Sequence, residues 1–137
     1  MLTFARRAMI PVGLAVLNAT CKDQAPTIEE LVGVYEAIVF TTEEDGTTID
    51  RLATGASITL TLELEGSTTG RLFVPGGGED GSDLDAELTG SWTLNGDTVE
   101  LSHAADTFLR DMTFTAEGMQ LSGQATFGVT ITVVLAK

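Results

Sequence analysis

The chain has 137 residues, which suffices for one domain and leaves no room for two. Hydrophobic residues make up 43% of it, a share that suits a globular core and excludes a disordered protein. Acidic side chains outnumber basic ones by 20 to 7, so the surface repels phosphate backbones and we expect no nucleic-acid partner. A soluble acidic surface explains this charge, and a surface for cations or for a basic partner is the alternative.

The first twenty residues have the parts of an export signal. Arg6 and Arg7 supply the positive start, and residues 8–17 form an apolar run that is too short to span a bilayer permanently. A buried or amphipathic helix is the alternative, but Pro11 and Gly13 both weaken a helix interior. Residues 1–20 are therefore interpreted as a signal peptide.

Cys21 lies immediately after this segment and before the polar stretch 22–26. The position resembles a lipobox, in which the cysteine is lipid-modified and becomes the new N-terminus. A lipobox has a large aliphatic residue and a small one where this chain has Asn18 and Thr20. Lipidation at Cys21 is the prediction, and ordinary cleavage that yields a soluble periplasmic or secreted protein is the alternative. Residues 21–30 are then a tether and the start of a short helix.

Catalytic and metal-binding residues are sparse. With one cysteine and one histidine, His103, the chain has no intramolecular disulfide and no Cys/His zinc cluster. His103 follows a predicted strand, where a loop histidine is expected. General acid–base catalysis needs paired groups in a cleft, whereas most carboxylates here fall on outward strand faces or in loops. We expect no enzyme, no cofactor and no metal site.

Beyond the tether, Thr27 and Glu30 form a capping-box pattern, which predicts one or two helical turns ending near Gly33. From there the hydrophobic period is two. The predicted strands are 33–42, 56–65, 68–74, 84–94, 97–102, 107–116, 119–123 and 125–136, and residues 47–54 could hold a further short strand.

Alternation is clearest in 84–94, where Leu84 to Leu94 on even positions face one way, in 57–65 and at the C-terminus. Gly-containing pairs predict turns at 45–46, 65–66, 95–96 and 117–118. With no helix long enough for a crossover, the sheet must be antiparallel. Closure into a barrel removes the exposed edges, so the predicted fold is all-β: a small antiparallel up-and-down β-barrel of about eight strands, with a sandwich as the alternative.

The longest irregular stretch is 75–83, which is rich in glycine and acid and is expected to be a mobile loop at one barrel end. Its acids suggest calcium, but the EF-hand spacing is absent because Ser82 and Leu84 stand where oxygen ligands are needed. A solvated loop is the preferred interpretation, with a calcium site as the alternative.

Arg110 interrupts the apolar pattern of its predicted strand, where it shares a face with Phe108, Met112 and Phe114. A charge there must be paired or reach the barrel rim. The preferred interpretation is a structural plug, paired with Asp106 or Asp111 and packed over Trp92 or Tyr35. An arginine that holds a ligand carboxylate is the functional alternative.

From residue 31 onward the chain resembles the lipocalin-like domains of small bacterial lipoproteins. The resemblance rests on the segments 31–35, 90–99, 111–114 and 121–123 and on the closing apolar strand. It implies an up-and-down barrel domain over 31–137 that binds a small apolar molecule or serves as a structural module of the envelope. Candidate ligand-binding residues are Tyr35, Trp92, Arg110 and Phe114.

Two functions follow from these predictions. The first is an exported lipoprotein of the bacterial cell envelope, monomeric and membrane-held through Cys21, whose barrel binds a small apolar or amphipathic molecule. The second is a structural or interaction lipoprotein with a filled barrel and no small ligand. An eight-stranded barrel has a size that permits either, because its interior is filled by its own side chains or holds one small ligand.

Overall fold

The structure is a computed structural model that describes residues 25–103 and 105–137; the predicted signal peptide and Cys21 lie outside them. Its elements in chain order are α1 (Ile28–Leu31), β1 (Gly33–Glu44), β2 (Thr47–Asp50), the 3₁₀ helix η2 (Leu52–Thr54), β3 (Ser57–Leu62), β4 (Ser67–Val74), β5 (Leu84–Glu87), β6 (Gly90–Asn95), β7 (Thr98–His103), the 3₁₀ helix η3 (Phe108–Asp111), β8 (Thr113–Glu117), β9 (Gln120–Thr126) and β10 (Thr130–Ala136).

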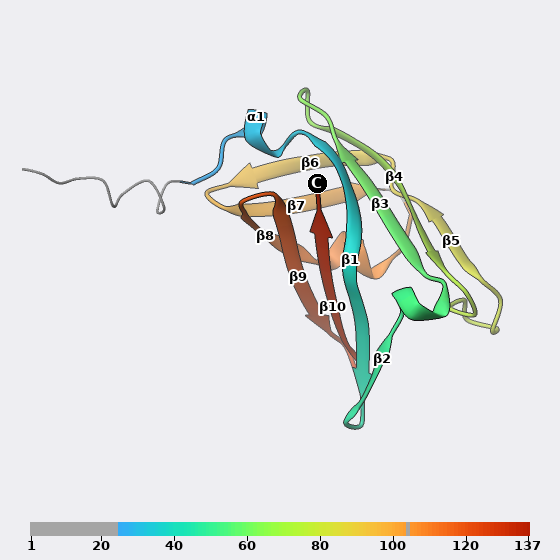
Figure 1. The fold of residues 1–137 in the computed structure, drawn as a ribbon. Helices are drawn as coiled ribbons and strands as arrows, with labels where there is room; N and C mark the ends of the chain where they lie inside the picture. Colours follow the sequence, from blue (N-terminus) through green and yellow to red (C-terminus); the bar gives the residue numbers. More distant parts are fainter. Residues whose placement is uncertain (1–24, 104) are drawn as a thin grey trace, which may run out of the picture.

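In this described part, eight strands form a closed antiparallel ring in the order β1, β3, β4, β6, β7, β8, β9 and β10 (Figure 1). Pairing of β10 with β1, from Glu36↔Ala136 to Glu43↔Thr130, closes the ring. The short strand β2 pairs with the far end of β1, and β5 pairs with β4. The all-β class and the small antiparallel barrel are thus confirmed, and the sandwich alternative is excluded. The unclear stretch 47–54 does hold a short strand, β2.

The predicted strand 84–94 is divided into β5 and β6, although its alternation of inward and outward side chains continues across the break. Arg71↔Glu87 before the break and Thr68↔Gly90 after it belong to one antiparallel register along β4. At the break the Leu88 carbonyl accepts a hydrogen bond of 2.7 Å from the Thr68 hydroxyl. The Leu88 N–H still donates to the Gly70 carbonyl at 3.0 Å, so the pairing along β4 keeps its register through the break.

The predicted strand 107–116 was wrong in its first half, where residues 108–111 form η3 and β8 begins only at Thr113. Leu109 and Met112 are both buried, at 1% and 2% exposure, and Phe108 packs against the same core. A strand cannot direct the adjacent residues 108 and 109 into one core, because neighbouring side chains point to opposite faces. In the 3₁₀ turn, residues three apart lie above one another, so Leu109 and Met112 reach the core together, and Phe108 packs beside them.

The four predicted turns all lie between paired strands, at 45–46, 63–66, 96–97 and 118–119. The boundary predicted near residue 124 was wrong: β9 continues to Thr126, and the chain reverses around Gly128, whose φ is 82°. The capping box is confirmed, with Glu30 N donating to Thr27 Oγ1 at 3.2 Å and Thr27 N donating to Glu30 Oε1 at 2.8 Å. It starts one helical turn, α1.

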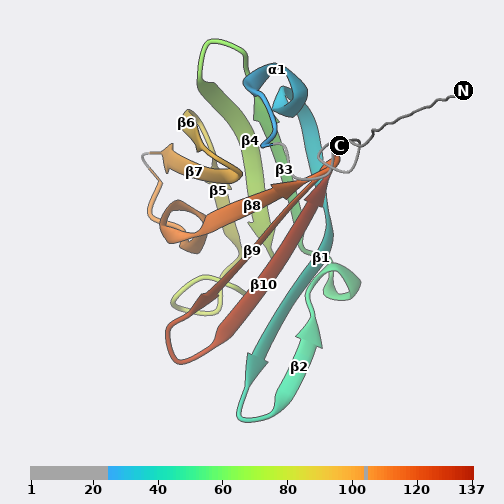
Figure 2. The ribbon, with the colours of Figure 1, turned by 90° about the vertical axis from the view of Figure 1, so that its left-hand side faces the viewer.

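Apolar side chains from every wall of the barrel meet in one core. Those with 0% exposure are Tyr35, Leu60, Leu62, Leu72, Leu88, Val99, Phe114, Leu121, Val133 and Leu135. Figure 2 shows α1 at one end of the barrel, and the hairpin β1–β2 and the turn β9–β10 at the other. Among the described residues, no helix has the length and apolarity needed to cross a bilayer.

Candidate functional site

Two of the four predicted ligand-binding residues, Tyr35 and Phe114, lie inside the barrel with 0% exposure. The Tyr35 hydroxyl donates a hydrogen bond of 2.7 Å to the Leu31 carbonyl, and burial raises the pKa of this phenol above its ordinary value. Phe114 faces Val99 of β7 and Gly123 of β9 in the strand register. Both side chains therefore serve the packed core, where a ligand reaches them only if the core rearranges.

Arg110 does not lie on the inward face of a strand, and this prediction was wrong. It belongs to η3, and its guanidinium donates to Asp106 Oδ1 at 2.7 Å, with 37% of the Arg110 side chain exposed. Asp106 is one of the two partners expected for it. The cation that lies over the Tyr35 ring is instead Lys137, with Nζ 5.9 Å from the ring centre. Leu109 and Met112 point inward from this turn, and Arg110 lies toward the surface.

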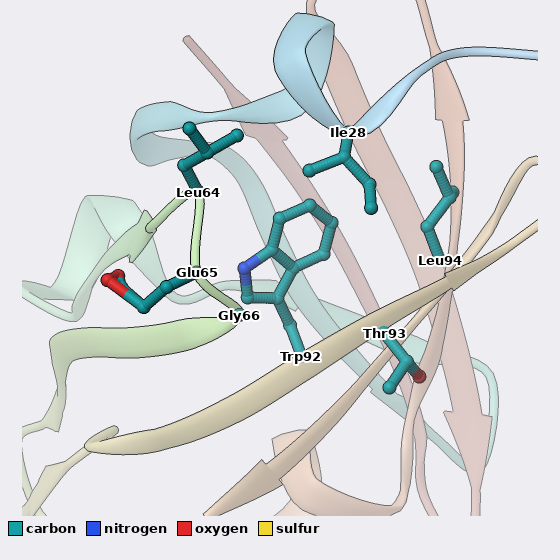
Figure 3. A pocket seen from close by; sticks show the side chains of 7 residues that line it. All are labelled: Ile28, Leu64, Glu65, Gly66, Trp92, Thr93 and Leu94. Carbon is teal, nitrogen blue, oxygen red and sulfur yellow. The ribbon is translucent and has the colours of Figure 1, made fainter.

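Trp92 is the fourth predicted residue, and it lies at the barrel end that carries α1. Trp92 is 5% exposed, and its indole forms the floor of an open hollow of about 290 Å³. Figure 3 shows the indole between Ile28 of α1 and Leu64 of the β3–β4 turn, with Leu94 beside it. The hollow is lined by Ile28, Leu64, Glu65, Gly66, Trp92, Thr93 and Leu94. We name the four apolar residues among them, Ile28, Leu64, Trp92 and Leu94, the apolar rim.

The β3–β4 turn positions both the indole and Leu64. Indole Nε1 donates to the Glu63 carbonyl at 2.9 Å, and the Trp92 backbone N–H donates to the Gly66 carbonyl at 2.9 Å. The polar atom of the indole is thus satisfied by backbone, which leaves its apolar ring to form the floor of the hollow. The predicted strand 56–65 was too long at this end: β3 ends at Leu62, and Leu64 is 60% exposed in the turn.

The helix α1, which supplies Ile28, is fixed to the barrel from two sides. Leu31 is buried at 1% exposure, and its carbonyl receives the Tyr35 hydroxyl. From the C-terminus, Lys137 Nζ donates to the Glu30 carbonyl at 2.5 Å and to the Val32 carbonyl at 3.1 Å. A cation on the last carbonyls of a helix is favourable, because these oxygens carry partial negative charge. Ile28 is therefore held in place although it is 43% exposed.

The hollow offers apolar surface and little else. Its carboxylate, Glu65, accepts a hydrogen bond from the Ser67 hydroxyl at 3.0 Å and points away from the indole (Figure 3). No group of three or more His, Cys, Asp or Glu residues able to hold a metal ion occurs among the described residues. This arrangement can hold an apolar group against Trp92, and the polar side chains of its lining are Glu65 and Thr93.

Two of the three acids of loop 75–83, Asp80 and Asp83, accept hydrogen bonds from their own loop. Asp83 Oδ1 accepts the Gly76 N–H at 3.0 Å, and Asp80 Oδ1 accepts the Ser82 hydroxyl at 2.6 Å. These hydrogen bonds from Ser82 lower the pKa of the Asp80 carboxyl. The loop lies at the barrel end opposite α1 (Figure 2).

A further acid, Asp85 of β5, forms a two-bond ion pair with Arg71 of β4, with both N–O distances at 2.7 Å. The hydrogen bonds from the guanidinium, together with its charge, lower the pKa of Asp85. Both side chains lie on the exposed outer wall, at 59% and 51% exposure. The pair therefore joins two strands and is separate from the hollow.

His103 was expected in a loop, and that prediction was wrong. It is the last residue of β7, is only 5% exposed, and its Nε2 lies 2.9 Å from the hydroxyl of Thr107, itself buried. A buried histidine bonded to a buried threonine is a structural polar contact at the entrance to η3.

Comparison with known proteins found no similarity: the chain matches no protein-family model, no curated protein and no solved structure.

Proposed function

We propose that this chain is an exported lipoprotein of the bacterial cell envelope, held to a membrane through Cys21, whose lipocalin-like barrel is a filled module that acts through its outer surface. The packing of the interior carries the second half of this proposal. A void large enough for water beside Tyr35, Leu88 or Phe114 would leave these side chains accessible surface, and they have none. Of the two uses of an eight-stranded barrel, filling by its own side chains agrees best with these burial values.

Export and anchoring rest on the sequence of residues 1–21, with its positive start, short apolar run and cysteine before a polar stretch. The test is to label cells that make the chain with a fatty-acid probe and to compare Cys21→Ser. We expect label in the wild-type protein, no label in the variant, and the wild-type protein in the membrane fraction. An unlabelled wild-type protein released in soluble form would favour the periplasmic or secreted alternative.

Binding of a small apolar or amphipathic molecule inside the barrel stays a prediction. It requires Tyr35 or Phe114 to leave its present packing, at a cost that the ligand would have to offset. Native mass spectrometry of protein purified from its host separates the two functions. An empty barrel agrees with the filled module, whereas one constant extra mass that disappears on unfolding would favour the ligand function.

A further inference from the structure

We propose that the apolar rim rests on the surface of the bilayer that carries the anchor, with Ile28 and Leu64 entering the boundary between headgroups and acyl chains. The inference deepens the proposed function and rests on its lipid anchor at Cys21. It assigns the barrel an orientation: the end with α1 faces the membrane, and the end with β2 and loop 75–83 faces away.

Exposed apolar side chains cluster at the barrel end that carries α1. Ile28 is 43% exposed and Leu64 is 60% exposed, and both border the hollow over Trp92. Single exposed apolar side chains are common on soluble proteins and need no explanation. Here two large ones come from separate segments and flank a tryptophan, the residue type enriched at membrane–water interfaces (Figure 3).

The tether between Cys21 and α1 is short. Cys21 precedes Ile28 by seven positions, so the chain between them spans at most about 25 Å even when fully extended. Since Tyr35 and Lys137 fix α1 to the barrel, this limit applies to the whole rim and not to a loose helix. A lipid at Cys21 thus makes contact of the rim with the bilayer an intramolecular event, for which a small apolar area suffices.

Negative charge around the apolar rim determines which kind of membrane surface it can approach. Glu29 and Glu30 of α1 and Glu65 of the β3–β4 turn are exposed next to the apolar residues. These carboxylates would be repelled by anionic headgroups within about one Debye length, roughly 8 Å at physiological salt. The partner we infer is therefore a zwitterionic lipid surface.

The test uses the mature, lipidated protein in phosphatidylcholine vesicles whose acyl chains carry bromine near the headgroup. Trp92 is the sole tryptophan of the chain, so its emission reports on the rim without any label. We expect brominated vesicles to quench this emission compared with unbrominated ones. Each of Ile28→Ser and Leu64→Ser should lower the ratio of docked to undocked protein roughly tenfold, from the apolar area it removes. Replacing the zwitterionic lipid with phosphatidylglycerol at low salt should also weaken docking.

The matched control is Phe127→Ser. Phe127 is an equally exposed apolar residue, at 56%, in the β9–β10 turn at the far end of the barrel (Figure 2). We expect this variant to be quenched like the wild type. Because all three residues are exposed, each variant should have the melting temperature of the wild type. That measurement checks that the variants fold.

The outcomes separate this inference from the anchor. Labelled protein that floats with the vesicles but shows no quenching, or equal quenching in Leu64→Ser and the wild type, overturns the rim contact and leaves the anchor standing. Protein without lipid at Cys21 overturns both. A dimer that Leu64→Ser dissociates, or a bound small molecule that shields Trp92 from the bromine, would show that another occupant covers the rim and would also overturn the inference.

Discussion

Truncation of Phe114 to alanine tests the filled barrel directly. Phe114 has 0% exposure, and its Cδ1 lies 3.0 Å from the position that a Cβ on Gly123 would take. Gly123, the residue of β9 that pairs with Phe114, therefore presents bare backbone to the ring. For Phe114→Ala we expect the free energy of unfolding to fall by about 3–5 kcal/mol, a large part of the roughly 5–15 kcal/mol typical of a whole domain.

The assay is denaturant unfolding followed by the emission of Trp92. Thr115→Ala is the control, because Thr115 is the exposed neighbour of Phe114 on β8, and its loss should change stability by about 0.5 kcal/mol or less. The truncation should also leave a dry apolar cavity, so benzene should raise the melting temperature of Phe114→Ala and leave that of the wild type unchanged. A loss below about 1.5 kcal/mol, or equal stabilisation of the wild type by benzene, would refute the filled interior.

Three further predictions concern single contacts. Gly90→Ala should lower the melting temperature strongly, because its Cβ would lie 2.0 Å from a backbone oxygen of β7; a variant as stable as the wild type would contradict this close approach. Tyr35→Phe should cost about 1–3 kcal/mol of unfolding free energy in the same denaturant assay, because the buried Leu31 carbonyl loses its donor, and a cost near zero would indicate that another donor replaces the hydroxyl. In an NMR titration the pKa of the Asp85 carboxyl should lie below the ordinary value of an aspartate, and in Arg71→Gln it should rise back to that ordinary value. Since the pKa of Asp85 is lowered in the folded state, the ion pair stabilises the fold fully at a pH above the ordinary carboxyl pKa. This stabilisation is lost as the pH falls through the lowered pKa. An Asp85 pKa that is unchanged in Arg71→Gln would contradict the assignment.

The sequence was sufficient for the class of fold because the barrel obeys local rules. Alternation in 84–94 assigned the faces correctly even across the break at Leu88, since side chains of an extended chain point alternately whatever their partners are. Glycine-containing pairs predicted the turns, because glycine readily adopts the positive φ that such turns need, as Gly46 does with a φ of 80°. The capping box at Thr27 is likewise a contact within four residues, which a sequence pattern can specify completely.

The same local rules failed where a distant part of the chain decided the outcome. Arg110 follows the strand pattern in the sequence, but the core takes both Phe108 and Leu109, which a strand cannot direct to one face and the 3₁₀ turn η3 does. Leu64 continues the apolar series of β3, yet the chain must reverse after Leu62 to pair with β4, so Leu64 emerges at the end of the barrel.

The sequence alone predicted one residue of the candidate site, Trp92, and placed it on the apolar face of a strand. Only the tertiary structure joined it to Ile28 and Leu64, because the pairing of β4 with β6 places Trp92 beside the β3–β4 turn and α1 lies over the same barrel end. It also decided that Tyr35 and Phe114 belong to the core, since burial depends on how all eight walls of the ring pack and not on the pattern of any one strand.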